Sequence, residues 1–293
     1  MNYLYAFFLA PFQDFIFMRH ALVACLALAL GCGPVGVLLV LRRMSLVGDA
    51  LSHAVLPGAA LGFLVSGLSL YAMTLGGMAA GLAVALLAGA VTRLTLLRED
   101  ASFAALYLIS LASGVLIVSL RGSNIDLIHV LFGTILAVDD AALILVAAIT
   151  TVTFLSLAII YRPLIVECFD PGFLRCVGGW GPAMHFIFLV LVVLNLVAGF
   201  RALGTLMAVG LMMVPAAAAR FWARQVWSMA LAAVVIALLS GYAGLLLSFH
   251  VNLPSGPAII LTAGVCYFFS VIFGTHASIY RRRRVALHLG GLT

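Results

Sequence analysis

The sequence contains no lysine: all fifteen basic residues are arginine. A P-loop needs a lysine that reaches the β- and γ-phosphates of ATP, and Schiff-base catalysis needs a lysine amine. The sequence also lacks the HExxH and GxSxG motifs of metalloproteases and serine hydrolases. We therefore expect a chain that is not an enzyme, so that any ATP hydrolysis linked to it takes place on a separate chain.

Charge is scarce as well. Only 8% of the 293 residues are charged, whereas 66% are hydrophobic; a soluble domain carries about 25% charged residues. No polar block or linker divides the chain, so the composition predicts one all-α, polytopic integral membrane domain. The net charge of +6 does not indicate a nucleic-acid partner, because the arginines stand in short clusters between apolar runs, as membrane topology signals do.

The apolar runs predict eight or nine membrane-spanning helices, each of which needs about 20 mostly apolar residues. Eight stays an alternative because the seventh run is short and follows the sixth almost directly. Residues 1–19 form a predicted interfacial lead-in, residues 20–275 the transmembrane domain, and residues 276–293 a basic cytoplasmic tail. The nine runs are 20–41, 51–69, 71–92, 103–120, 139–160, 183–200, 203–220, 227–249 and 256–275.

The arginines predict how these runs are oriented. With nine spans and a cytoplasmic C-terminus, all arginines except Arg19, Arg121 and Arg201 lie on the cytoplasmic side, in agreement with the positive-inside rule. Eight spans would instead place the N-terminus inside. The longest interruption, residues 161–181, falls in the cytoplasm, where we expect a short helix that lies across the membrane face.

One segment, residues 41–62, places ionisable side chains in or beside a predicted span. Asp49 and His53 are four residues apart, so a helix carries them on one face, in a stripe with Ser45 and Leu56. Ionisable residues in a membrane are costly and indicate function, and a carboxylate with a neutral imidazole suits zinc or manganese. Two plainer interpretations stay open: Asp49 is solvated near the interface, or the two residues form only an i,i+4 pair.

Prolines and two further histidines add weaker signals. Pro57 removes a backbone N–H and frees the carbonyl of His53, as in the broken helices that line transport sites, and Pro215 predicts a kink. His129 and His250 fall on the predicted outer side, where each could receive a metal or serve as an interfacial polar residue. An intramembrane metalloenzyme that uses Asp49 and His53 as metal ligands is the alternative to a transport protein. For such an enzyme the sequence shows neither a third metal ligand nor a general base.

Five blocks of the sequence resemble the permeases of bacterial zinc/manganese ABC importers. They occur in the order found in that family and cover roughly residues 20–275. The first block is specific to the family, and the five together are a strong signal. The blocks are RRMSLVGDALSHAVLPGAALG at 42–62, LFGTILAV at 131–138, FDPGF at 169–173, GTLMAVGLMMVPAAAAR at 204–220 and PSGPAIIL at 254–261.

The resemblance implies an importer permease that works as a homodimer in the inner membrane, with a cytoplasmic C-terminus. A separate ATPase would dock around Phe169, Asp170 and Pro171, and a periplasmic metal-binding protein would deliver the ion. The transmembrane Asp and His of the family map onto Asp49 and His53. No permanently bound cofactor is implied. We expect zinc as the transported ion, with manganese or iron as the alternatives.

Overall fold

The computed structural model describes residue 5, residues 7–66, 69–95, 97, 99–120, 138–170, 172–173, 176, 181–276, 278 and 280. Within these residues every regular secondary-structure element is an α-helix, as the composition predicted. The helices are α2 (Ala10–Asp14), α3 (Ile16–Leu41), α4 (Ser45–Ser66), α5 (Leu70–Leu94), α6 (Glu99–Leu120), α8 (Asp140–Phe169), α10 (Gly181–Leu203), α11 (Thr205–Ala219), α12 (Val226–Val251) and α13 (Ser255–Phe273).

Each of the nine predicted runs overlaps one helix of the structure, from α3 to α13. Seven helices in the described part of the chain are long and apolar enough to cross a membrane: α3, α4, α5, α8, α10, α12 and α13. Helix α11 has only 15 residues, and it is the short run that left the number of spans open. Gly204 separates it from α10 and has a φ of 96°, a conformation that glycine adopts without the steric cost of a side chain.

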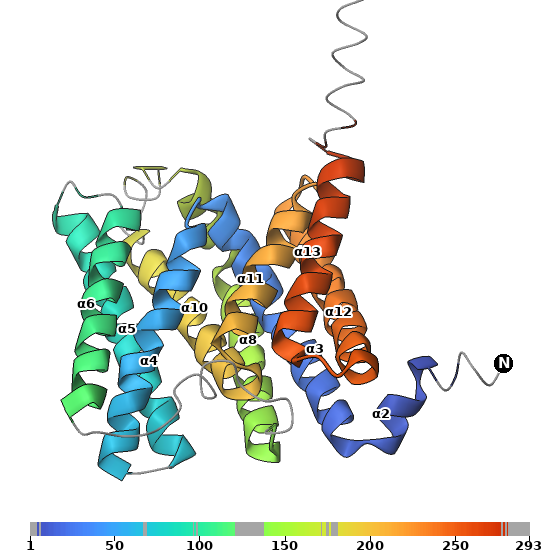
Figure 1. Ribbon diagram of the computed structural model, residues 1–293. Coiled ribbons are helices and arrows are strands. Elements are labelled where there is room, and N and C mark those ends of the chain that lie inside the picture. The colour runs from blue at the N-terminus through green and yellow to red at the C-terminus, as the bar shows by residue number, and fades with distance from the viewer. Residues whose placement is uncertain are drawn as a thin grey trace, which may run out of the picture.

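The helices run alternately up and down, so that their ends form two edges of the molecule (Figure 1). At one edge, Arg42 beyond the end of α3 pairs with Glu167 near the end of α8. At the other, Arg201 near the end of α10 pairs with Asp139, which caps the start of α8. We call these the Arg42 edge and the Arg201 edge. The end of α13 lies at the Arg42 edge, where the backbone N–H of His276 donates to the Phe221 carbonyl.

Small residues let α4 and α5 approach closely; the glycines Gly58 and Gly62 of α4, and Gly77 and Gly81 of α5, have the GxxxG spacing typical of such contacts. A Cβ atom added to Gly58 would lie 2.7 Å from the carbonyl carbon of Gly76. A Cβ atom added to Gly77 would lie 2.8 Å from a methyl group of Val55. The backbones are therefore in direct contact, and neither glycine has room for a side chain.

A buried polar cluster joins α3, α8 and α10 inside the bundle. The side-chain amide of Asn195 donates to the Thr153 hydroxyl and to the Leu191 carbonyl, at 2.8 Å in each case. The Thr150 hydroxyl donates to the Ala27 carbonyl at 2.9 Å. Because hydrocarbon supplies no partner for such groups, these hydrogen bonds fix how the three helices face one another.

The structure corrects the prediction for residues 161–181. Helix α8 continues to Phe169 with Pro163 inside it, so the first half of this segment prolongs a membrane helix and does not lie across the membrane face. Ile160, Leu164 and Glu167 are buried on one side of this extension, with the spacing of a helix face. Their packing outweighs the loss of one backbone hydrogen bond at the proline.

We predict that Gly58→Ala destabilises the protein, because the new methyl group meets the backbone of α5. Overpacking of this kind costs about 1–3 kcal/mol. Gly264→Ala is the matched control, since a Cβ atom there meets nothing within 4 Å and alanine is the better helix former. Thermal unfolding of the purified protein in detergent measures both. Equal midpoints for the two variants would contradict the close α4–α5 packing.

Candidate functional site

A tight turn at the Arg42 edge sets the start of α4. Arg43 has a left-handed conformation, with a φ of 58°. Its backbone N–H donates to the Val40 carbonyl at 3.2 Å, and the N–H of Met44 donates to the Leu39 carbonyl at 2.9 Å. This pair of bonds is a Schellman motif, which terminates α3. Helix α4 begins directly afterwards, at Ser45.

Asp49 and His53 lie on one face of α4, as their spacing predicted. The distance from His53 Nε2 to Asp49 Oδ1 is 3.7 Å, and the two side chains are 38% and 62% exposed. The Ser52 hydroxyl donates to the Asp49 carbonyl at 2.7 Å. The ring of His53 lies 6.0 Å from that of Tyr107 on α6, measured between ring centroids. The carboxylate and the imidazole therefore point out of the single chain, beside α6.

A single chain does not offer a complete metal site at this point. Across the described ranges, no three His, Cys, Asp or Glu side chains are close enough to hold a metal ion together. Asp49 and His53 supply one oxygen and one nitrogen ligand, whereas zinc sites use four ligands. Two exposed ionisable residues on a spanning helix are also costly against lipid.

The two prolines that the sequence analysis singled out both lie inside continuous helices. Pro57 lies within α4 and Pro215 within α11. Pro57 is buried against Gly114 of α6, where an added Cβ atom would lie 2.6 Å from the proline ring. The proline therefore helps to hold α6 beside the face of α4 that carries Asp49 and His53.

The other predicted ligands lie apart from this face. His250, near the end of α12, stacks on Phe7 with 4.1 Å between ring centroids, and its Nε2 lies 3.1 Å from the Phe7 carbonyl oxygen. Tyr242 also donates a hydrogen bond to the backbone of this lead-in, at Phe8. His250 thus holds the N-terminal segment against α12. His129 falls outside the described residues.

The predicted ATPase contact lies at the Arg42 edge. Phe169 ends α8, and Asp170 follows as its C-cap residue. The Asp170 carboxylate accepts a hydrogen bond of 2.9 Å from the backbone N–H of Phe173. Phe169 and Phe173 are 65% and 55% exposed, so two aromatic rings flank an acidic residue at the surface. Pro171 lies outside the described residues.

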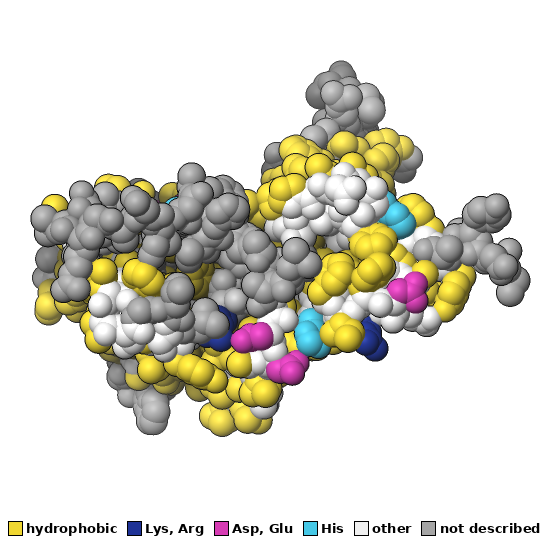
Figure 2. Space-filling view, turned by 60° about the horizontal axis from the view of Figure 1, so that its bottom comes forward, with side chains coloured by type: hydrophobic (Ala, Val, Ile, Leu, Met, Phe, Trp, Pro, Cys, Tyr) yellow, Lys and Arg dark blue, Asp and Glu magenta, His cyan; other side chains and the backbone are white. Residues whose placement is uncertain are grey.

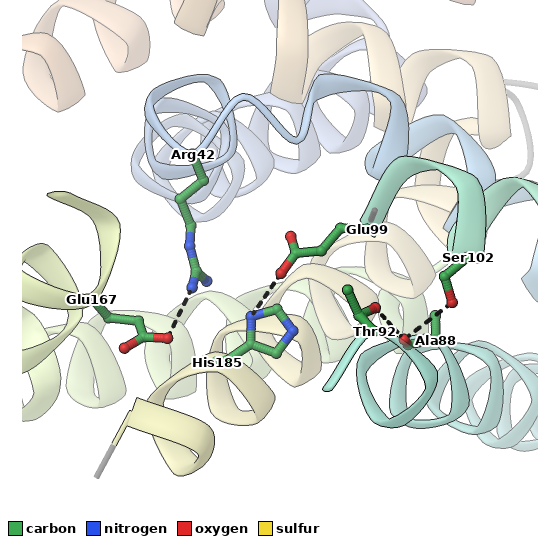
Figure 3. Close-up of polar contacts among 7 residues, drawn as sticks. All are labelled: Arg42, Ala88, Thr92, Glu99, Ser102, Glu167 and His185. Carbon is green, nitrogen blue, oxygen red and sulfur yellow. Dashed lines mark hydrogen bonds and ion pairs between the residues drawn. The ribbon is translucent and has the colours of Figure 1, made fainter. Parts of the chain in front are cut away.

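Sequence reasoning missed two ion pairs at the same edge, which Figure 3 shows. Arg42 Nη2 lies 3.6 Å from Glu167 Oε1, and both side chains are buried. His185 Nδ1 lies 3.9 Å from Glu99 Oε1. The sequence alone indicates Arg42 only as a topology signal. The one sequence signal was Glu167, an acidic residue between apolar neighbours.

The Arg201 edge carries a band of acidic, arginine and histidine side chains between apolar surfaces (Figure 2). Arg201 Nη2 lies 3.7 Å from Asp139 Oδ2, and its Nη1 donates to the Thr74 hydroxyl at 3.0 Å. His20 Nε2 lies 3.6 Å from Asp140 Oδ1. These pairs tie the ends of α3, α5, α8 and α10 together at the face opposite the Arg42 edge.

Comparison with known proteins gives concordant matches over nearly the whole chain. Residues 14–274 match the ABC 3 transport family. The chain is 32% identical to the manganese import system permease protein ScaB of Streptococcus parasanguinis over 263 residues, which are 90% of this chain and 92% of the relative. It is 31% identical to the manganese transport system membrane protein MntC of Halalkalibacterium halodurans, over 95% of this chain and 96% of the relative.

A solved structure has the same fold. PsaBC from Streptococcus pneumoniae in complex with Fab superposes with a TM-score of 0.81 at 29% sequence identity. The match covers 94% of this chain and 98% of the other. This chain therefore shares its overall fold with that protein.

Proposed function

This chain belongs to the ABC 3 transport family, and we propose that the ion it carries is manganese. As a family member it is the membrane-spanning permease, a transport subunit, of a metal-type ABC importer. The sequence led us to expect zinc first. Manganese replaces it in the proposal because the two relatives described above are both named for manganese.

The proposed ion path runs along the face of α4 that carries Asp49 and His53. A carboxylate oxygen and an imidazole nitrogen suit a divalent transition metal. No cysteine lies on this helix: Cys25 and Cys32 are buried in α3, and Cys168 and Cys266 belong to α8 and α13. A path without thiolate ligands fits manganese, which prefers oxygen ligands, better than it fits a soft ion. The observation that carries the proposal is the exposed Asp49–His53 pair on a spanning helix.

We propose that a second copy of the chain covers this face. Asp49 is 62% exposed in the single chain, and a charged group on a spanning helix normally faces protein or a water-filled cavity. Two copies related by a twofold axis present the same patch to each other. Their two Asp49 and two His53 side chains would then supply four oxygen and nitrogen ligands. The homodimer predicted from the sequence would thus complete a site that one chain leaves half built.

We propose that ATP hydrolysis on another chain supplies the energy for transport. The sequence has no lysine for a P-loop, and the exposed Phe169, Asp170 and Phe173 form a compact surface at the Arg42 edge. We propose that the separate ATPase subunit docks on these residues. The proposed periplasmic metal-binding protein would face the Arg201 edge, and the membrane would be the bacterial inner membrane.

We predict that Asp49→Asn and His53→Gln each lower manganese uptake about tenfold or more, which corresponds to about 1.4 kcal/mol of lost stabilisation in transit. Asn keeps an oxygen but loses the charge that offsets a divalent cation, and Gln keeps a polar group but loses the imidazole nitrogen. A merely structural i,i+4 pair contributes only about 0.2–0.5 kcal/mol. The measurement is uptake of manganese, zinc and iron by a deletion strain with matched membrane levels of each variant.

The matched controls are Asp140→Asn and His20→Gln. His20 Nε2 lies 3.6 Å from Asp140 Oδ1 at the Arg201 edge, so these substitutions change a histidine–aspartate pair in the same way as the substitutions in α4. These variants should transport normally. Near-normal uptake in Asp49→Asn and His53→Gln would remove the α4 face from the mechanism. Faster uptake of zinc than of manganese by the wild type would overturn the choice of ion and leave the path intact.

A second prediction concerns the ATPase contact. Asp170→Arg should lower co-purification of the ATPase and reduce uptake, because it reverses the charge and removes the acceptor for the Phe173 N–H. Asp170→Asn keeps that acceptor, so it separates the role of charge from that of local structure. Asp14→Arg, the same reversal at an exposed acidic residue of α2, is the control. Normal association and uptake in Asp170→Arg would show that this segment only connects two helices.

A third prediction concerns orientation. By the positive-inside rule, the arginines of the Arg42 edge predict that this edge lies in the cytoplasm. A reporter fused after Arg284 should be active only if it is a cytoplasmic type, and one inserted after Asn252 only if it is a periplasmic type. Reporter activity in cells measures both fusions. The opposite pattern would invert the topology and place the proposed ATPase contact outside the cell.

A further inference from the structure

A buried ion pair connects the end of α8, where the ATPase is proposed to dock, with the turn before α4, the helix proposed to line the ion path. Arg42 Nη2 and Glu167 Oε1 lie 3.6 Å apart, and the two side chains are only 8% and 3% exposed. The guanidinium carbon of Arg42 lies 5.0 Å from the ring centre of Phe188 on α10. In the part of the chain that the structure describes, Arg42 Nη1 is buried without a hydrogen-bond partner. The charge of Arg42 is therefore balanced mainly by Glu167.

On the α8 side, the pair lies next to the proposed docking residues. Glu167 is in the last turn of α8, two residues before Phe169, and the helix ends at the Asp170 cap. Because a helix is stiff over one turn, a displacement of Phe169 and Asp170 moves Glu167 with it. The exposed rings of Phe169 and Phe173 are the surface on which a partner would act.

On the α3 side, the pair lies next to the helix that carries the proposed ion path. Arg42 precedes the left-handed residue Arg43, and the two Schellman hydrogen bonds hold this turn closed. Met44 is buried and Ser45 starts α4. The turn therefore has little freedom to absorb a movement of Arg42. Such a movement would be transmitted to the first turns of α4 and to Asp49.

We infer that Arg42 and Glu167 are positioning residues that couple movement of the Phe169–Asp170 segment to helix α4, an inference that rests on the proposed function. Figure 3 shows the Arg42–Glu167 pair with the Glu99–His185 pair beside it. A buried pair suits this role because either charge, if separated from its partner while still buried, becomes an uncompensated charge in a low-dielectric interior, which is strongly destabilising. The two segments consequently move together or not at all.

The test uses the complete transporter, reconstituted in vesicles with its ATPase and its metal-loaded binding protein. Glu167→Gln keeps the shape but leaves Arg42 as an unbalanced buried charge. Arg42→Met with Glu167→Met removes both charges and keeps the volume, a change that buried ion pairs often tolerate in stability. Asp139→Asn is the control: it removes the carboxylate partner of Arg201 at the opposite edge and keeps a side chain that caps α8 well.

We expect both Glu167→Gln and the double variant to assemble with the ATPase and to hydrolyse ATP. The number of manganese ions taken up per ATP should fall about fivefold or more, the range over which coupled sites influence each other. Asp139→Asn should keep the wild-type ratio.

Two outcomes would overturn the inference. In the first, the double variant takes up as many manganese ions per ATP as the wild type. In the second, uptake and ATP hydrolysis fall by the same factor, which would indicate a purely structural pair. Absence of manganese uptake by the wild-type complex would instead refute the proposed function, so the two failures are distinguishable.

Discussion

A polar group inside a membrane has to find its partner within the protein, because hydrocarbon offers none. This constraint accounts for most of the polar contacts in the bundle. Asn195 donates to Thr153 and to a backbone carbonyl, and Arg42 is balanced by Glu167 and the Phe188 ring. The Asn195–Thr153 bond joins α10 to α8, and the Arg42–Glu167 pair joins the end of α3 to α8. The few polar side chains therefore help to determine which helix ends and faces meet, beside the small residues that let α4 and α5 approach closely.

The Asp49–His53 pair departs from this pattern. Its two members contact each other at 3.7 Å, but both remain partly exposed on one chain. Elsewhere in the described structure the ionisable pairs connect two helices, whereas this pair stays on a single helix and faces outward. A group that is left incomplete by its own fold is suited to an exchangeable partner, which in a metal permease is the transported ion.

The sequence predicted the all-helical fold and the positions of the long helices, because length and hydropathy dominate in a membrane protein. It also placed Asp49 and His53 on one helix face, since that follows from helical periodicity alone. The extension of α8 through Pro163 was missed, because the burial of Leu164 and Glu167 depends on neighbouring helices. The Arg42–Glu167 pair was missed for a related reason: its members are far apart in sequence, and no local pattern links them.

Helix α11 is too short to cross the hydrocarbon core by itself. Its 15 residues span about 22 Å, less than the roughly 30 Å of a bilayer's hydrocarbon core. A Cβ atom on the buried residue Gly48 of α4 would lie 2.6 Å from the end of the Met213 side chain of α11, so the short helix packs against the side of α4 that faces the bundle, behind Asp49 and His53. A helix of this length leaves the free N–H or C=O groups of one end at membrane depth, where hydrocarbon supplies no partner. Neighbouring helices therefore have to shield the ends of α11 from lipid.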